Sequence, residues 1–151
     1  MTHSPRIQAA RAAITDLVHA YALHVRSGNP LLCAPLFTAD ARFETRVSSA
    51  GRSPQTSNAM AGRDAIIAHI SKAMQAGARL CPMIHNLLID VNGTDASSNC
   101  VMVAMDLQSG TELVGEYVDT YRLDDVWRFT SRTYTILLER RFAPPGAGPE
   151  S

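Results

Sequence analysis

The spacing of apolar residues changes along this chain and divides it into two regions. In the first region apolar residues recur at intervals of three and four, and the longest such stripe runs from Ile7 to Val25. That spacing places them on one face of an amphipathic helix. Ser4 and Pro5 precede the stripe and are typical of a helix start. In the second region, from Ile84 to Thr135, apolar and polar residues alternate as they do in strands with one buried face.

Shorter segments lie between the long helix and the alternating region. We expect a short helix from Pro30 to Phe37, a strand from Ala41 to Val47, and a further helix from Gly62 to Gly77. Residues Ser48 to Ala59 are rich in serine, glycine, proline, glutamine and asparagine. This composition predicts a long surface loop, and a loop beside a pocket often serves as a lid.

Tight turns divide the alternating region into four strands. Asn92-Gly93 between apolar runs is a strong hairpin signal, because both residues tolerate the positive φ of a type I′ turn. Further turns are expected at Ser109-Gly110 and Asp124-Asp125. Helices gathered on one side of a mainly antiparallel sheet predict an α+β fold. Such a sheet must curve around the first helix, which leaves an open mouth where a small ligand can bind.

Composition and charge narrow the choice of partners. The chain has 151 residues, 46% of them hydrophobic, which suits one globular domain with a sizeable core. We place this domain at residues 1–141 and expect a flexible tail at 142–151, where proline and glycine dominate. The 14 basic and 14 acidic residues cancel, which argues against nucleic acid or an anionic membrane surface as a partner. No apolar run reaches the roughly 18 residues of a membrane span.

The cysteines and the first residues indicate a cytoplasmic protein. Cys33, Cys81 and Cys100 are odd in number and far apart, so they match neither a disulfide framework nor a zinc site. The first six residues lack the apolar core of a signal peptide. We therefore expect reduced thiols, a cytoplasmic location and no metal or other cofactor.

Several segments, taken in order, resemble the SnoaL-like branch of the nuclear transport factor 2-like superfamily. They are Ala13–Tyr21, Leu36–Ala41, Gly62–Ile66, His85-Asn86, Gly115–Tyr121 and Val126–Arg132. The resemblance covers about residues 6 to 140. It implies a cone-shaped α+β barrel, with a curved and mainly antiparallel sheet packed around three N-terminal helices. This fold hosts dehydratases, isomerases, cyclases, oxygenase small subunits and binding modules, so it does not imply one reaction.

The resemblance also implies a set of catalytic residues. Scytalone dehydratase and hexachlorocyclohexane dehydrochlorinase use a strand histidine as general base, and this position corresponds to His85. A pocket arginine of the dehydrochlorinase corresponds to Arg132. The oxyanion donors of ketosteroid isomerase correspond to Tyr21 and Asp119. Together these residues would move a proton and hold developing negative charge.

Simple alternation along the strand places His85 on one face with Leu87, Ile89 and Val91. This arrangement predicts that the imidazole ring faces the pocket. A buried histidine bonded to a backbone carbonyl is the structural alternative. His69 falls off the apolar face of its helix, so we expect it to be solvated.

The other three residues also have structural alternatives. Arg132 and Asp119 could form an ion pair across the sheet, and Tyr21 could be a core aromatic whose hydroxyl reaches the mouth of the pocket. Two positions depart from the resemblance. Arg26 stands where the dehydratase and the dehydrochlorinase carry the aspartate that orients the histidine, and Thr45 stands where the isomerase carries its proton-carrying aspartate.

The leading prediction is a small-molecule-binding protein that acts as a cofactor-independent lyase or isomerase, by proton transfer on an apolar substrate. One alternative is a non-catalytic carrier or sensor of a hydrophobic metabolite. Another is the small structural subunit of a ring-hydroxylating oxygenase. By analogy with the family, we also expect a homo-oligomer, either a dimer or a trimer.

Overall fold

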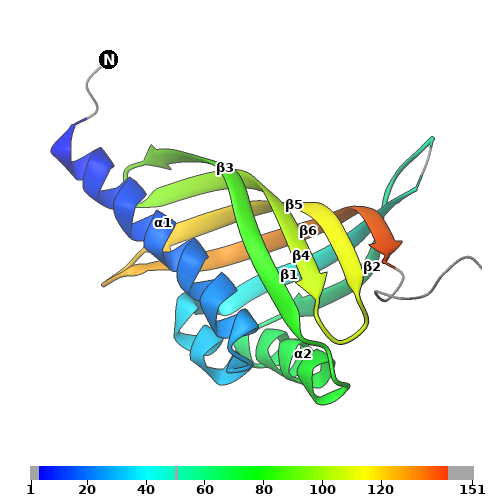
Figure 1. The fold of residues 1–151 in the computed structure, drawn as a ribbon. Coiled ribbons are helices and arrows are strands. Elements are labelled where there is room, and N and C mark those ends of the chain that lie inside the picture. The colour runs from blue at the N-terminus through cyan, green and yellow to red at the C-terminus, as the bar shows by residue number, and fades with distance from the viewer. Residues whose placement is uncertain (1–3, 50, 143–151) are drawn as a thin grey trace, which may run out of the picture.

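The long amphipathic stripe folds as predicted and lies across one curved sheet. The computed structural model describes residues 4–49 and 51–142, and within these ranges three helices cover one side of six strands (Figure 1). Helix α1 spans Pro5–Arg26, and the Ser4 side chain caps its first turn by accepting a hydrogen bond from the Ile7 amide. No helix within these ranges is long and apolar enough to cross a membrane.

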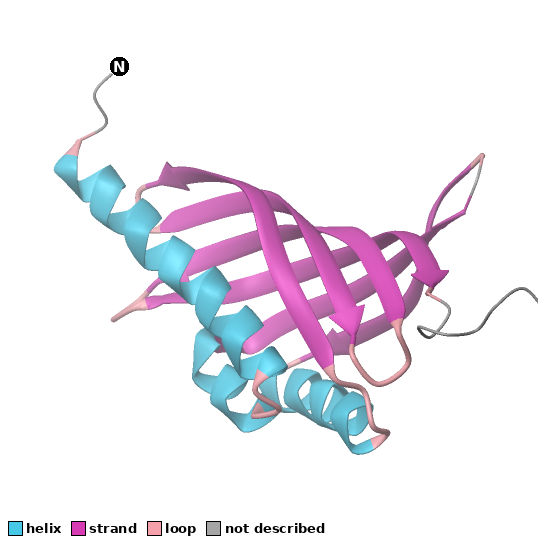
Figure 2. Cartoon of the chain, viewed as in Figure 1, coloured by secondary structure: helices cyan, strands magenta, loops and turns pink. Residues whose placement is uncertain are grey.

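Two shorter helices complete the helical layer at one end of α1. The 3₁₀ helix η1 spans Pro30–Leu36, and α2 spans Arg63–Gln75 after Gly62, whose φ of 93° suits a residue without a side chain. Figure 2 shows all three helices on one side of the sheet. The buried core lies between these helices and the concave face of the sheet.

The sheet has the order β2-β1-β6-β5-β4-β3, and each neighbouring pair is antiparallel except β1 and β6. The sheet is curved but not closed, because β2 and β3 form its two edges. The predicted α+β class is therefore confirmed. The strands are β1 Phe37–Ser49, β2 Arg52–Ala61, β3 Leu80–Asn92, β4 Asp95–Asp106, β5 Thr111–Leu123 and β6 Trp127–Arg141.

The predicted loop at Ser48–Ala59 is wrong, because most of this segment forms β2. The β1–β2 hairpin extends beyond the rest of the sheet (Figure 1), and all of β2 except Met60 is exposed. A strand that is exposed on both faces shows no alternation of apolar and polar residues, so its sequence resembles a loop. Pro54 is tolerated because β2 is an edge strand.

The β3–β4 hairpin is confirmed, although its turn differs from the predicted type. Asn92 pairs with Asp95, and the positive φ of 64° falls on Gly93 rather than on both central positions of an Asn-Gly turn. The tail predicted from residue 142 lies outside the described residues, apart from Phe142. The backbone amide of Phe142 donates a hydrogen bond of 3.0 Å to the carbonyl oxygen of Gly110.

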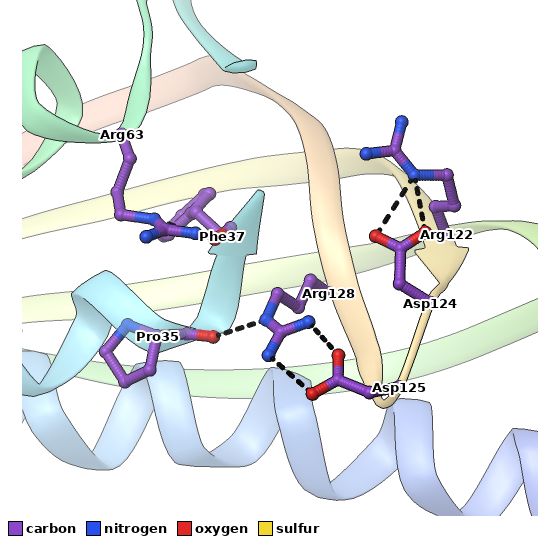
Figure 3. Close-up of polar contacts among 7 residues, drawn as sticks. All are labelled: Pro35, Phe37, Arg63, Arg122, Asp124, Asp125 and Arg128. Atoms are coloured by element: carbon purple, nitrogen blue, oxygen red, sulfur yellow. Dashed lines mark hydrogen bonds and ion pairs between the residues drawn. The ribbon is translucent and has the colours of Figure 1, made fainter. Parts of the chain in front are cut away.

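Two arginines bond to backbone carbonyl groups at the end of η1 and the start of β1. Arg128 of β6 pairs with Asp125 in the β5–β6 turn and donates from Nε to the carbonyl oxygen of Pro35 (Figure 3). Arg63, at the start of α2, donates from Nε to the carbonyl oxygen of Phe37, at a distance of 2.9 Å. These contacts hold η1 at the place where the helical layer meets β1 and β6.

Candidate functional site

A cavity of about 200 Å³ lies between the helices and the concave face of the sheet. Most of its lining is aliphatic or aromatic, and the polar side chains in it are few. Among the described residues, no carboxylate lines the cavity. The lining residues are Tyr21, Val25, Phe43, Thr45, Asn58, His69, Ile70, Ala73, Met74, Ala78, Leu80, Pro82, Met102, Ala104, Leu113, Tyr117 and Tyr134.

The prediction that the ring of His85 faces this cavity is wrong. His85 pairs with Val101 of β4, whereas the next pair is Leu88 with Asn99, so β3 contains one extra residue between the two pairs. Asn86 lies at this bulge and has a φ of 53°. An extra residue reverses the alternation, which turns His85 to the exposed outer face although Ile89 is buried.

On the cavity side of the bulge, β3 contributes only apolar side chains. Leu80 and Pro82 line the cavity, and Ile84 is half-buried against the core. In this part of the structure β3 therefore supplies no group that can accept a proton inside the cavity. A general base at the cavity must come from another element.

His69 of α2 was predicted to be solvated, but it lies at the cavity. It is half-buried in the cavity lining, and its ring centroid lies 6.4 Å from that of Phe43. Its spacing was a usable signal, because His69 follows the fully buried Ile66 by three residues and so shares its side of α2. It is the one histidine among the described lining residues.

Three tyrosines form the wall of the cavity beside α1. Tyr21 comes from α1, Tyr117 from β5 and Tyr134 from β6. The ring of Tyr117 lies 6.3 Å from that of Tyr21 and 5.2 Å from that of Tyr134, measured between centroids. Tyr21 thus lines the cavity. We call these three residues the tyrosine wall.

Gly115 makes room for the outermost ring of the tyrosine wall. A Cβ atom at this position would lie 2.5 Å from the carbonyl oxygen of Thr135 and 2.7 Å from Cε2 of Tyr134. Both distances are too short for a real contact, so only glycine allows β5 and β6 to approach each other here. The absence of a side chain at Gly115 therefore helps to set the position of the Tyr134 ring.

The tyrosine hydroxyls stay protonated at neutral pH. Burial raises the pKa of Tyr21 to about 12, although the nearby Arg132 opposes this shift. Burial also raises the pKa of Tyr117 and of Tyr134 above the usual value, and the neighbouring Tyr21 adds to the shift in both. The wall therefore presents neutral O–H groups, which can donate hydrogen bonds.

Asp119 and Arg132 form a buried ion pair across β5 and β6. They face each other in the register, with Arg132 Nε 2.8 Å from Asp119 Oδ1 and Nη2 2.8 Å from Oδ2. Both side chains are fully buried. Burial alone would lower the pKa of Arg132, but the attraction of Asp119 outweighs it and raises that pKa well above its usual value. The ion-pair alternative is therefore the arrangement in the structure.

Aromatic rings enclose the Arg132 guanidinium. Its Cζ lies 3.8 Å from the ring centroid of Tyr117, 4.4 Å from that of Tyr21 and 4.5 Å from that of Phe129. Neither Arg132 nor Asp119 lines the cavity. The resemblance implied that these two residues contact a ligand directly. Their positions outside the cavity lining do not provide that contact. They support the tyrosine wall from behind.

A second tyrosine on β5 belongs to the same polar group. The Tyr121 hydroxyl lies 2.6 Å from Ser98 Oγ and donates to Asp119 Oδ2 at 3.2 Å. We call Ser98, Asp119, Tyr121 and Arg132 the ion-pair cluster.

Two buried polar atoms near the cavity have no partner among the described residues. They are Nη1 of Arg132 and the hydroxyl oxygen of Tyr134. Buried polar groups are nearly always paired, so an unpaired one calls for an explanation. In the same part of the chain, no group of three His, Cys, Asp or Glu side chains could hold a metal ion.

The two positions that depart from the resemblance have different environments. Thr45 is buried and lines the cavity from β1. Arg26 is exposed at the end of α1 and does not line this cavity. A proton-transfer site with the relatives' full set of groups is therefore not assembled around the cavity.

Comparisons with known proteins agree with this architecture. A model of the SnoaL-like domain matches residues 6–133. A proposed scytalone dehydratase from Novosphingobium aromaticivorans has a similar structure, with 24% identity, a TM-score of 0.72 and 97% of each chain covered. No curated protein shows significant similarity to the chain.

Two further structures have the same fold. The β subunit of a proposed aromatic-ring-hydroxylating dioxygenase from the same organism is 21% identical, with a TM-score of 0.73, and 89% of this chain and 93% of that chain are covered. A hexachlorocyclohexane dehydrochlorinase, LinA type 2, is 17% identical with a TM-score of 0.70, and 92% and 96% of the chains are covered. Identities this low establish a shared fold and leave the reaction open.

Proposed function

The chain belongs to the SnoaL-like domain family, and from its cavity we propose that it binds a small, mainly apolar molecule. The observation that carries this proposal is the cavity between α1, α2 and the sheet, with its aliphatic and aromatic lining. Buried apolar surface of this kind favours an apolar ligand because binding removes that surface from water.

The size of the cavity limits the size of the ligand. At about 200 Å³ it is smaller than most drug-binding pockets, which run from about 300 to 1,000 Å³. An apolar cavity of about 150 Å³ can hold benzene. The space therefore suits a molecule of one or two rings, and indane, a two-ring hydrocarbon, is a suitable probe.

Filling the cavity tests this proposal. Ala104 of β4 is buried in the cavity lining, so Ala104→Phe places a ring in the ligand's space. We expect indane to raise the midpoint of thermal unfolding of the wild type but not of A104F, since only a ligand that binds the native state stabilises it. Leu88→Phe on the exposed outer face of β3 is the matched control and should respond like the wild type. Equal responses from all three proteins would contradict cavity binding.

A second candidate function is proton transfer on the bound molecule, as in a cofactor-independent lyase or isomerase. The position of His69 in the lining favours it, because imidazole can accept a proton near neutral pH. In this proposal His69 takes the place that we first gave to His85. Tyr21 would then face the reacting molecule directly, while Asp119 and Arg132 would hold Tyr21 and Tyr117 in position.

Hydrogen–deuterium exchange tests proton transfer without a known substrate. 1-Indanone has acidic C–H groups beside its carbonyl, and a base in the cavity would speed their exchange in D₂O. We expect the wild type and His85→Gln to speed this exchange equally, and His69→Gln to lose the effect. Exchange at the buffer rate with wild-type protein that binds 1-indanone would favour a carrier or sensor without chemistry.

Two further expectations stay predictions. A role as an oxygenase subunit rests on structural likeness alone, and co-purification with a larger chain would test it.

The exposed apolar side chains Met83, Leu88 and Val118 suggest where a second copy would pack on the outer face of the sheet. Sedimentation analysis of the wild type and of Val118→Asp would test the predicted homo-oligomer. A monomeric wild type would contradict it.

A further inference from the structure

The tyrosine wall carries three hydroxyl groups, and that of Tyr134 has no partner among the described residues. Tyr21 and Tyr117 are each 5% exposed, and the hydroxyl oxygen of Tyr134 is buried without a partner. The Arg132 guanidinium lies beside Tyr21 but can only donate, so it gives the Tyr21 O–H group no acceptor. All three rings border the cavity. A ligand in the cavity would therefore lie against the tyrosine wall.

Among the described residues, the polar groups behind the wall are seen to pair with one another and not to accept from the wall. Asp119 Oδ1 accepts from Arg132 Nε, and Oδ2 accepts both from Arg132 Nη2 and from the Tyr121 hydroxyl. Arg132 offers only donors, and its Nη1 is itself unpaired. The donors that Asp119 accepts from are therefore Arg132 and Tyr121, and no hydroxyl of the tyrosine wall is among them.

A ligand can pair with the wall hydroxyls if it brings an acceptor. We propose that Tyr21, Tyr117 and Tyr134 form a donor site that binds an acceptor oxygen, such as a carbonyl, on an otherwise apolar ligand. This inference rests on the proposed binding function and adds the chemical class of the ligand. The aliphatic side of the cavity, with Ile70, Met74 and Leu113, holds the apolar part of the molecule.

The alternative occupants of the donor site are distinguishable. An ordered water could satisfy the same hydroxyls, since water accepts hydrogen bonds as well as a carbonyl does. A ligand oxygen that only replaces such a water gains little affinity, whereas an oxygen that the site is shaped to bind gains more. A matched pair of ligands that differ in one oxygen therefore separates the two cases.

The pair 1-indanone and indane provides this test, because the two molecules have the same ring system and differ by one carbonyl. We expect the wild type to bind 1-indanone about tenfold more tightly than indane, the gain from one or two hydrogen bonds. The ratio of the affinity for 1-indanone to that for indane should fall towards one in Tyr134→Phe. It should fall further in the double variant Tyr117→Phe/Tyr134→Phe. Affinity for indane should stay within about twofold, because the rings remain. Titration calorimetry would measure both affinities.

Tyr121→Phe is the matched control, since it removes a buried hydroxyl that the protein already uses. It should keep the tenfold preference. Equal affinity of the wild type for the two ligands would overturn the donor site while leaving cavity binding intact. An unchanged preference in the double variant would also overturn it. If neither ligand binds, the proposed function fails and the donor site fails with it.

Discussion

The ion-pair cluster and the tyrosine wall lie side by side on the same strands, yet they treat their polar groups in opposite ways. In the ion-pair cluster Asp119 accepts from Arg132 and Tyr121, and Tyr121 also contacts Ser98. In the tyrosine wall the hydroxyl of Tyr134 is buried and unpaired. Tyr117 and Tyr121 are only four residues apart on β5, so both face the interior with the same strand geometry.

The difference between the two regions is a difference in packing. The ion-pair cluster is filled, and its members are fully or almost fully buried. The tyrosine wall borders about 200 Å³ of space. Polar groups in a filled region need partners within the protein, because no water or ligand can reach them. Most polar atoms of the ion-pair cluster have such partners, and Nη1 of Arg132 is its exception among the described residues. Beside a cavity the same groups stay available for a ligand, and a ligand that paired with them would recover the stability that they cost.

Breaking the ion-pair cluster should have the largest effect. Asp119→Leu leaves the Arg132 guanidinium buried without its carboxylate, and removing one partner of a buried pair costs about 3–5 kcal/mol. Urea unfolding would measure this loss in the free energy of unfolding. The double variant Asp119→Leu/Arg132→Met is the control, because it removes both charges and should recover most of the loss. A loss under about 1 kcal/mol in the single variant would contradict a buried, mutually dependent pair.

A methyl group at Gly115 should have the next largest effect. The Cβ of Gly115→Ala would meet the Thr135 carbonyl oxygen at 2.5 Å, and overpacking of this kind costs about 1–3 kcal/mol. The same methyl would push the Tyr134 ring, so indane affinity should change as well. Thermal unfolding with and without indane would measure both effects. Unchanged stability together with unchanged affinity would mean that β5 and β6 do not depend on this close approach.

The architecture was predictable where a simple period holds over a long stretch. The stripe from Ile7 to Val25 became the buried face of α1, and the turns at Gly93 and Gly110 joined the expected strands. Strand β2 was missed because a strand exposed on both faces carries no hydrophobic alternation. Hydrophobic periodicity reflects which residues are buried. It therefore predicts a helix or strand only where one face of that element is buried and the other is exposed.

The candidate site was harder to predict, because one inserted residue changes which side chains face inward. Alternation counted back from Ile89 places His85 inside, but the bulge at Asn86 reverses every position before it. No local signal marks this bulge apart from an asparagine, which tolerates a positive φ. The ion pair of Asp119 and Arg132 was predicted only as an alternative. The sequence shows both residues, but it does not show the strand register that places them opposite each other.

Removing one hydroxyl from each region compares them directly. Tyr121→Phe deletes a hydroxyl that contacts Ser98 and Asp119, which should cost about 1–2 kcal/mol of unfolding free energy. Tyr134→Phe deletes an unpaired one, so its stability should stay within about 0.5 kcal/mol of the wild type or rise. Chemical denaturation of the two variants in parallel would measure the contrast. Equal losses would show that the Tyr134 hydroxyl has a partner in the folded protein.

An exposed ion pair on β6 should give the smallest effect and completes the comparison. Arg128 pairs with Asp125 at the surface, four residues before the buried Arg132, and this hydrogen bond lowers the pKa of Asp125 from the usual 3.8 to about 2. Because the folded pKa lies below the unfolded one, the pair stabilises the fold above about pH 4, and its contribution disappears as the pH falls through about 2.

Asp125→Asn should therefore flatten the pH dependence of unfolding slightly between pH 4 and 2. The difference from the wild type should shrink in 1 M salt, because solvent and ions screen an exposed pair. Urea midpoints at both pH values and both salt concentrations would measure it. The buried Asp119–Arg132 pair should not respond to salt in this way, since the solvent does not reach it. A loss in Asp125→Asn as large as that in Asp119→Leu would mean that burial does not separate the two arginines of β6.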